Sequence, residues 1–181
     1  MTPRPEPPAL LPAHEPGGPR WYAMDHIVTV GETSRARFVY YSHLFSWQGV
    51  CRERFGFENC PQYMRSLTQD YAMLTTTASC EFLAEIFEAD RISLRLAIPW
   101  LRLHLMKGLF EFVRIGRSGD SGDGGTGDGA QQLVARGEQT WANTLRSGDP
   151  DHPVFTPAPW SPELLDACIR MGTDISRALT R

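Results

Sequence analysis

The spacing of apolar residues between Arg37 and Phe57 predicts one long helix. Two neighbouring series recur at steps of three and four residues: Tyr40, Leu44, Trp47, Cys51 and Phe55, and Tyr41, Phe45, Gln48 and Arg52. A helix that is apolar on most of its sides is usually buried in a protein rather than laid on its surface. Gly56 is a suitable residue for ending it. We therefore expect a buried helix of about 18 residues, roughly 27 Å long.

The segments around this helix have the composition of β-strands. Alternating or β-branched runs indicate five strands, at residues 21–31, 71–84, 91–103, 105–115 and 132–145. In the third run, Pro99 favours a bulge or an edge position, because proline cannot donate a hydrogen bond to a neighbouring strand. Strands before and after a buried helix predict an α+β fold in which a sheet curls about that helix.

The remaining segments are expected to be a terminal arm, connections and a second helix. Residues 1–20 are rich in proline and predict an extended, poorly ordered arm. Residues 58–70 predict a connection with one short helical turn, and residues 146–160 a Pro- and Asp-rich connection. Residues 161–179 predict an amphipathic helix, with Ser161 as its cap and Pro162 at its first position. The chain thus divides into an arm at 1–20, a domain at 21–145 and a C-terminal extension at 146–181.

Composition narrows the classes of function. The 181 residues are 41% hydrophobic and 22% charged, with a formal net charge of −3. These values fit one soluble domain and give no reason to expect nucleic-acid binding. The long helix contains Arg52, Glu53 and Arg54, so it is too polar to span a membrane. The first 20 residues lack the apolar core of a signal peptide.

The four cysteines form no C-x-x-C pair and lack histidines at zinc-ligand spacing. We expect them to be free thiols in a reducing cytoplasm, and we expect neither a metal nor a cofactor. Residues 118–130 contain a formal G-x-G-x-x-G, but their aspartates would repel phosphate and a strand follows rather than a helix. Asp120, Asp123 and Asp128 leave a calcium loop as the lesser alternative to a mobile hairpin loop.

The helix run WQGVCRERF, preceded by GET and VYYSHL, resembles the hotdog-fold thioesterases. The similarity is to the thioesterases of enediyne polyketide biosynthesis, in the 4-hydroxybenzoyl-CoA thioesterase-like superfamily, and it covers residues 21–145. It implies a single hotdog domain, in which a five-stranded antiparallel sheet wraps around one long central helix, plus a C-terminal helix. It also implies hydrolysis of an acyl thioester, polyketide in origin, β-keto or polyene, carried by an acyl carrier protein domain of a polyketide synthase. The expected assembly is a cytoplasmic homodimer or homotetramer with its pocket between subunits.

The resemblance also suggests roles for individual residues. Arg52 matches the arginine of the helix motif and is expected to orient the acyl chain or its β-keto oxygen. Ser34 stands where many hotdog thioesterases have Asp and the enediyne enzymes have Asn, and it is expected to position the carbonyl or the water. Glu32 is a third catalytic candidate. Leu44 replaces a mid-helix tyrosine of the enediyne enzymes.

The helix N-terminus is expected to hold the carbonyl oxygen as it becomes negative, through amides near Phe38, Val39 and Tyr40. The expected substrate-binding set is completed by Tyr41, Phe45 and Gln48. No strong base is obvious in the sequence. The carboxylates weighed for that role are Glu53, Glu58 and Glu32, and the histidines are His26 and His43.

The resemblance leaves three functions to be distinguished. The first is the thioesterase, with water as the nucleophile. The second is a hotdog dehydratase or cyclase acting on a carrier-bound chain, which needs His26 or His43 paired with a carboxylate across the subunit interface. The third is a catalytically silent acyl-binding homologue, which the departures at Ser34 and Leu44 suggest.

Overall fold

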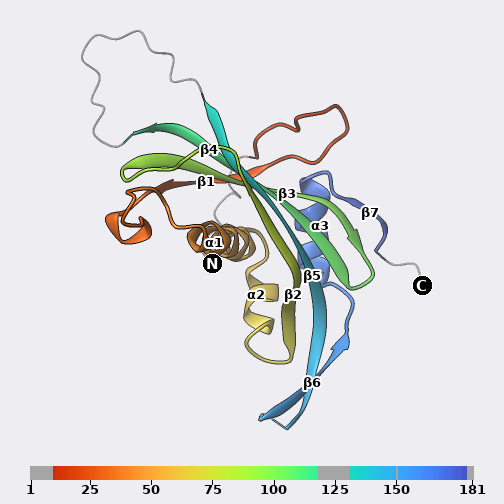
Figure 1. Ribbon diagram of the computed structural model, residues 1–181. Helices are drawn as coiled ribbons and strands as arrows, with labels where there is room; N and C mark the ends of the chain where they lie inside the picture. The colour runs from red at the N-terminus through yellow and green to blue at the C-terminus, as the bar shows by residue number, and fades with distance from the viewer. Residues whose placement is uncertain (1–9, 118–130, 150, 179–181) are drawn as a thin grey trace, which may run out of the picture.

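The computed structural model describes residues 10–117, 131–149 and 151–178, and in it an antiparallel sheet wraps around the long helix α1 (Figure 1). Helix α1 spans Ser42–Asn59. The main strands are β1 Tyr22–Ile27, β2 Tyr71–Phe82, β3 Asp90–Arg102, β4 Leu105–Arg117 and β5 Gln132–Asp149. Their order in the sheet is β1–β3–β4–β5–β2, with every neighbouring pair antiparallel. The five predicted strands, the central helix and the α+β class are confirmed.

The sheet has two further strands that the sequence did not indicate. Strand β6, His152–Pro157, pairs with the end of β5, and β7, Asp174–Arg177, pairs in parallel with β3. The prediction of a plain connection at 146–160 is therefore wrong. The prolines of this segment argued against a strand in the sequence. An edge strand such as β6 nevertheless tolerates proline.

The other elements are short helices. The 3-10 helix η1, Val30–Glu32, follows β1, and α2, Pro61–Ser66, follows α1. Helix α3, Pro162–Arg170, begins as predicted, because the Ser161 hydroxyl accepts a hydrogen bond from the Leu164 amide. It is shorter than predicted, since Gly172 follows with a φ of 76°, a backbone that ends a helix. Pro99 lies within a register shift between β3 and β4, which confirms the predicted irregularity.

The predicted start of α1 at Arg37 is wrong by several residues. A tight hairpin lies before the helix: Thr33 bridges Val39, and the Ser34 amide donates to the Phe38 carbonyl. Arg37 takes the left-handed conformation at this turn, with a φ of 67°. Between this turn and Tyr41, whose backbone is already helical, the Val39 amide is bonded to the Ile86 carbonyl. The apolar residues between 37 and 41 have helical spacing by coincidence, because this segment lies before the helix.

One face of α1 packs on the sheet and the other is exposed. The buried residues of the helix are Leu44, Trp47, Gln48, Cys51, Phe55, Gly56 and Asn59. On the opposite face Val50 is 50% exposed and Phe57 is 61% exposed. The prediction of burial on most sides is therefore wrong for the single chain, and the exposed apolar residues leave room for a partner.

A chain of buried amides fixes the height of α1 above the sheet. Gln48 donates to the Ser79 carbonyl of β2 and accepts from Gln139 of β5, whose oxygen in turn accepts from the Trp141 indole. Gly137 lies directly below Gln48, and a side chain there would collide with it. The N-terminal end of the helix is held against the sheet in this way.

Candidate active site

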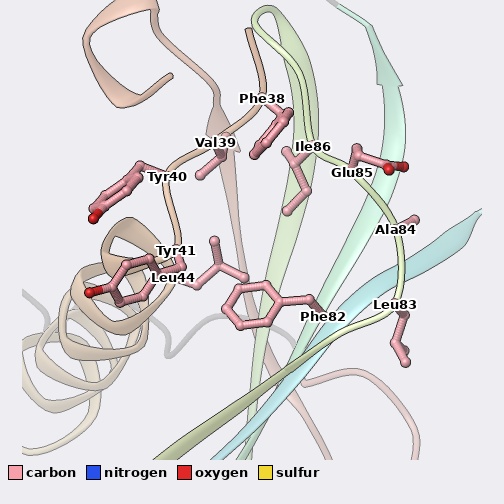
Figure 2. A pocket seen from close by; sticks show the side chains of 10 residues that line it. All are labelled: Phe38, Val39, Tyr40, Tyr41, Leu44, Phe82, Leu83, Ala84, Glu85 and Ile86. Carbon is pink, nitrogen blue, oxygen red and sulfur yellow. The ribbon is translucent and has the colours of Figure 1, made fainter. Parts of the chain in front are cut away.

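An apolar cavity of about 480 Å³ opens at the N-terminal end of α1. Its size falls in the range usual for small-molecule sites. It is lined by Phe38, Val39, Tyr40, Tyr41, Leu44, Phe82, Leu83, Ala84, Glu85 and Ile86 (Figure 2). Figure 2 shows Leu44 of the helix facing Phe82 across this space, with Ile86 beside them. Two segments far apart in the sequence therefore form its walls.

Two backbone amides at this end of the helix have no partner among the described residues. The Val39 amide donates to Ile86, and the Tyr40 amide donates to the Glu32 carbonyl at 3.0 Å. The prediction that the Val39 and Tyr40 amides are free donors of the helix N-terminus is therefore wrong, and the helix begins later than predicted, at Ser42. At the start of α1, the amides of Tyr41 and Ser42 have no partner in the part of the chain that the structure describes, and the Phe38 amide, further from the helix, has none there either. The Tyr41 and Ser42 amides carry the positive end of the helix dipole, and Tyr41 itself lines the cavity.

Glu32 holds the loop before α1 in place. Its carboxylate accepts from the Thr29 amide at 2.7 Å, from the Trp47 indole at 2.7 Å and from His26. Burial favours the neutral acid, but the hydrogen bonds from Thr29 and Trp47 outweigh it, so the pKa of Glu32 is lowered. Neither Glu32 nor His26 lines the cavity. The arrangement gives Glu32 a positioning role through the helix residue Trp47, rather than contact with a ligand.

Ser34 occupies the corner of the hairpin before α1. Its hydroxyl accepts from the Ala36 amide at 3.2 Å, and its carbonyl accepts from the Arg37 amide. The three-residue loop Arg35–Ala36–Arg37 follows, and Arg37 fills the left-handed position where glycine is normally preferred. Ser34 is close to the cavity in sequence but is absent from its lining.

Arg52 is partly buried between α1 and the β2–β5 edge of the sheet, about 15 Å along the helix from Ser42. Its guanidinium donates to the Thr75 hydroxyl at 3.1 Å and lies 5.6 Å from the centre of the Trp141 ring. Its Nε is buried without a partner among the described residues. Burial lowers the pKa of Arg52, with partial compensation from Glu53. Within one chain the structure does not bring Arg52 together with Ser34 and Glu32.

Beside Arg52 lies a void of about 10 Å³, whose walls include Met64, Met73 and Met106. Methionine is flexible and accommodates changes of shape. The unpaired Nε of Arg52 therefore lies in apolar surroundings, where a buried polar group without a hydrogen bond is costly.

The other candidates fall into two groups. Phe38, Val39, Tyr40 and Tyr41 line the cavity as predicted, whereas Phe45 and Gln48 do not. The Glu53 carboxylate lies 3.8 Å from the Arg52 guanidinium, and Glu58 forms an ion pair with Arg54. Neither carboxylate lines the cavity, and His43 does not line it either. Cys51 is not a nucleophile, because burial raises the pKa of its thiol to about 12.

The wall formed by residues 82–86 was missed as a ligand-binding segment. It is fixed from below by Asp90, which accepts from the Phe87 amide at 2.9 Å and from Arg114 at 2.9 Å. Arg114 also donates to the Glu85 carbonyl. No local signal could have shown this, because Asp90 and Arg114 belong to different strands that meet only in the folded sheet.

The described residues contain no group of three or more metal-binding side chains. The suggested calcium loop at 118–130 lies outside them. No helix in the described ranges has both the length and the apolar character needed to cross a membrane.

Comparison with known proteins identifies the family. The chain is 30% identical to the dynemicin thioesterase, with a TM-score of 0.69, covering 83% of this chain and 96% of that one. The chain belongs to the hotdog-fold thioesterases. A 1,4-dihydroxy-2-naphthoyl-CoA thioesterase from Synechocystis has the same fold at 17% identity, with a TM-score of 0.65 and coverage of 82% and 96%. The 4-hydroxybenzoyl-CoA thioesterase of Pseudomonas sp. strain CBS-3 does so at 14% identity, with a TM-score of 0.63 and coverage of 82% and 99%. No family model and no curated protein sequence matches the chain.

This hotdog thioesterase thus carries an apolar cavity next to the unpaired amides of its central helix. The predicted resemblance is confirmed by the similarity to the dynemicin enzyme. The roles of Arg52, Ser34 and Glu32 in catalysis stay predictions.

Proposed function

We propose that this hotdog thioesterase hydrolyses an acyl thioester held by an acyl carrier protein, with a polyketide chain as the acyl group. The observation that carries the proposal is the pair of unpaired amides, Tyr41 and Ser42, at the edge of the apolar cavity. Amide donors at a helix N-terminus stabilise the negative oxygen that forms when a thioester carbonyl is attacked.

The chemistry requires only water as a co-reactant. Water attacks the carbonyl carbon and gives up a proton, while the carbonyl oxygen accepts hydrogen bonds from the two amides. The carbon–sulfur bond then breaks, and the departing thiolate takes up a proton to leave a free acid and a free thiol. The lining of the cavity contains one carboxylate, Glu85, which Figure 2 shows directed away from the space between Leu44 and Phe82. The proposal therefore relies on electrostatic assistance rather than on a dedicated base.

The nature of the cavity supports a long, unsaturated acyl chain. Phe38, Tyr40, Tyr41 and Phe82 give it aromatic walls, against which conjugated carbon chains pack well. The dynemicin thioesterase, at 30% identity, is described in connection with polyene binding. A polyene or β-keto polyketide is the corresponding proposal for this chain.

We infer further that the site is completed by a second copy of the chain. Strand β2 pairs only with β5 among the described strands, so its other edge is free to pair with its own copy about a two-fold axis. Antiparallel pairing of two β2 strands brings the Thr75 end of one toward the Phe82 end of the other. The partner subunit's Arg52, which is anchored near Thr75, would then approach the cavity.

The dehydratase or cyclase has less support. It needs a histidine that reaches the substrate, and none of the residues lining the cavity is a histidine. His26 is paired with Glu32 inside the chain, on the far side of the loop 38–40 from the cavity wall.

The test compares two variants at one position. Tyr41→Pro removes an amide donor, and the native φ of −52° at Tyr41 suits proline. Tyr41→Ala removes the same side chain but keeps the donor. With acyl and β-ketoacyl carrier-protein thioesters, we expect thiol release by the wild type and a loss of roughly 100-fold in kcat for Tyr41→Pro relative to Tyr41→Ala.

Equal rates for the two variants would show that the Tyr41 amide does not stabilise the transition state. Loss of water from the substrate without thiol release would support the dehydratase, and binding without turnover would support a silent homologue. Arg52→Ala, measured in the same assay, is expected to lower kcat/KM most for β-ketoacyl substrates.

A further inference from the structure

Two exposed arginines flank the turn that leads into the cavity wall. Arg35 and Arg37 belong to the three-residue loop between Ser34 and Phe38, and Phe38 is the first residue of the cavity lining. The loop belongs to the orange segment that projects beside α1 in Figure 1. Neither guanidinium has a hydrogen-bond or ion-pair partner among the described residues. Two cations are therefore free at one edge of the opening.

The backbone at Arg37 makes its choice of side chain unusual. Its φ of 67° is the left-handed conformation that the hairpin turn requires. Glycine or asparagine takes this conformation with less strain than any long side chain. The Arg37 amide donates to the Ser34 carbonyl, but its guanidinium has no hydrogen-bond or ion-pair partner in the described residues, so this side chain is available to a group outside the chain.

Two of the carboxylates near this loop, Glu32 and Glu85, are directed away from it. Glu32 is bound by Thr29, Trp47 and His26, so its charge is directed inward. Glu85, on the opposite wall, points away from the space in Figure 2. Glu88 also lies near, since it follows Phe87, which bridges Phe38. Two arginines against this one carboxylate leave a positive charge at the rim of an apolar cavity, which suits an apolar ligand with an anionic group at its outer end.

We propose that Arg35 and Arg37 bind the phosphate at the end of the pantetheine arm that delivers the acyl group. The inference rests on the proposed thioesterase function and names the part of the substrate that lies outside the cavity. Even a fully extended backbone from Arg37 to Ser42 would span at most about 17 Å, so the two ends of this segment lie within the reach of an extended pantetheine arm. The thioester would then reach the Tyr41 and Ser42 amides while the phosphate stays at the rim. The same phosphate chemistry occurs in coenzyme A and on acyl carrier proteins.

The test compares thioesters that differ only in the phosphate. Acyl-phosphopantetheine and acyl-pantetheine carry the same acyl group, and acyl-CoA and the acyl carrier protein extend the phosphate in two different ways. In the double variant Arg35→Gln/Arg37→Asn we expect KM for acyl-phosphopantetheine to rise about three- to tenfold more than KM for acyl-pantetheine. The wild-type KM for the phosphorylated substrate should also rise with salt. Arg170→Gln, on the exposed end of α3, is the matched control for loss of positive charge.

A second measurement separates binding from folding. Arg37→Gly and Arg37→Asn relieve the backbone strain, so the expected result is an unchanged or higher Tm together with weaker binding of phosphopantetheine in calorimetry. A lower Tm would mean that the arginine stabilises the fold, and would overturn the assignment.

The remaining outcomes are also decisive. Equal KM changes for the two pantetheine substrates overturn the phosphate site while leaving the thioesterase intact. An effect confined to the carrier protein overturns it in favour of a contact with the protein surface. If the wild type hydrolyses no thioester, the proposed function fails, and calorimetry with phosphopantetheine and pantetheine still decides the site: preferential binding that the double variant abolishes supports it, and equal binding overturns it.

Discussion

At the scale of single residues, Glu32 is the side chain on which the geometry next to the cavity depends. It binds Thr29 of the preceding loop and Trp47 of α1, and its own carbonyl accepts from the Tyr40 amide. These contacts join the two ends of the hairpin to the helix. A change at Glu32 therefore alters where α1 begins, although the carboxylate itself is remote from the cavity lining.

The lowered pKa of Glu32 predicts a specific dependence of stability on pH. A carboxyl with a lowered folded-state pKa stabilises the protein above its unfolded value, about 4.3, and the stabilisation is lost as the pH falls through the folded-state pKa. Glu32→Gln should therefore be less stable than the wild type by about 1–3 kcal/mol at pH 7, and the difference should shrink below about pH 4.

Urea unfolding at several pH values measures this difference. Glu138→Gln is the control, because Glu138 is exposed and paired only with Lys107, and it should change stability by less than about 0.5 kcal/mol. A deficit in Glu32→Gln that is the same at pH 7 and at pH 3.5 would show that shape, not charge, explains the role of Glu32.

The sequence predicted which residues lie at the cavity better than it predicted the contacts that they make. Tyr40 and Tyr41 were expected near the ligand and do line the cavity, because the family motif fixes their place relative to the helix. The unpaired amides were displaced from their expected positions, since the left-handed turn at Arg37 delays the helix start. Only glycine or asparagine would have marked such a turn in the sequence, and Arg37 is neither.

At the scale of elements, the distance between α1 and the sheet is set by a glycine. A Cβ added at Gly137 of β5 would lie 2.2 Å from the Gln48 amide nitrogen and 2.8 Å from the Ser79 carbonyl oxygen. The second contact is backbone and cannot rotate away. We expect Gly137→Ala to destabilise the protein by about 2–3 kcal/mol and to reduce activity by shifting α1.

Gly49→Ala is the matched comparison. Gly49 lies in the middle of α1 with nothing within 4 Å of an added Cβ, so alanine there should raise helix stability by up to about 1 kcal/mol. Chemical unfolding of both variants gives the two signs. If both substitutions shift stability in the same direction, close packing at Gly137 does not determine the helix position.

Elements were predictable where local pattern and final environment agree. Strand β3 alternates and is central, and Ser161 with Pro162 marks the start of α3, so both were found. Strand β6 and the short β7 were not, because their sequences carry proline or too few apolar residues, and their pairing with β5 and β3 depends on the rest of the sheet. Pairing partners that are distant in sequence leave no local trace.

At the scale of the whole molecule, three features of the single chain are explained by the proposed dimer or are compatible with a partner. Its β2 edge is unpaired among the described strands, its α1 exposes Val50 and Phe57, and its Arg52 lies far along the helix from the cavity. A two-fold dimer through β2 addresses the first and the third together, because each cavity would receive its arginine from the other subunit. The sequence motif places Arg52 on the same helix as the cavity residue Leu44 and does not indicate whether the two would serve one site or two.

Mixing two inactive variants tests this arrangement. In a dimer of Arg52→Ala and Tyr41→Pro subunits, the Arg52→Ala subunit keeps an intact cavity, which the partner subunit's Arg52 would complete, while the other site lacks both groups. Random pairing makes half the dimers mixed with one working site each, so co-expression should restore about a quarter of the wild-type specific activity. Adding Thr77→Lys and Ser79→Lys to both subunits places like charges across the β2 pair, and should abolish the recovery and halve the mass in light scattering. The same two lysines at Val154 and Thr156 of β6 should change neither. If each cavity instead uses its own Arg52, no mixture regains activity, because every subunit then lacks one of the two groups it needs.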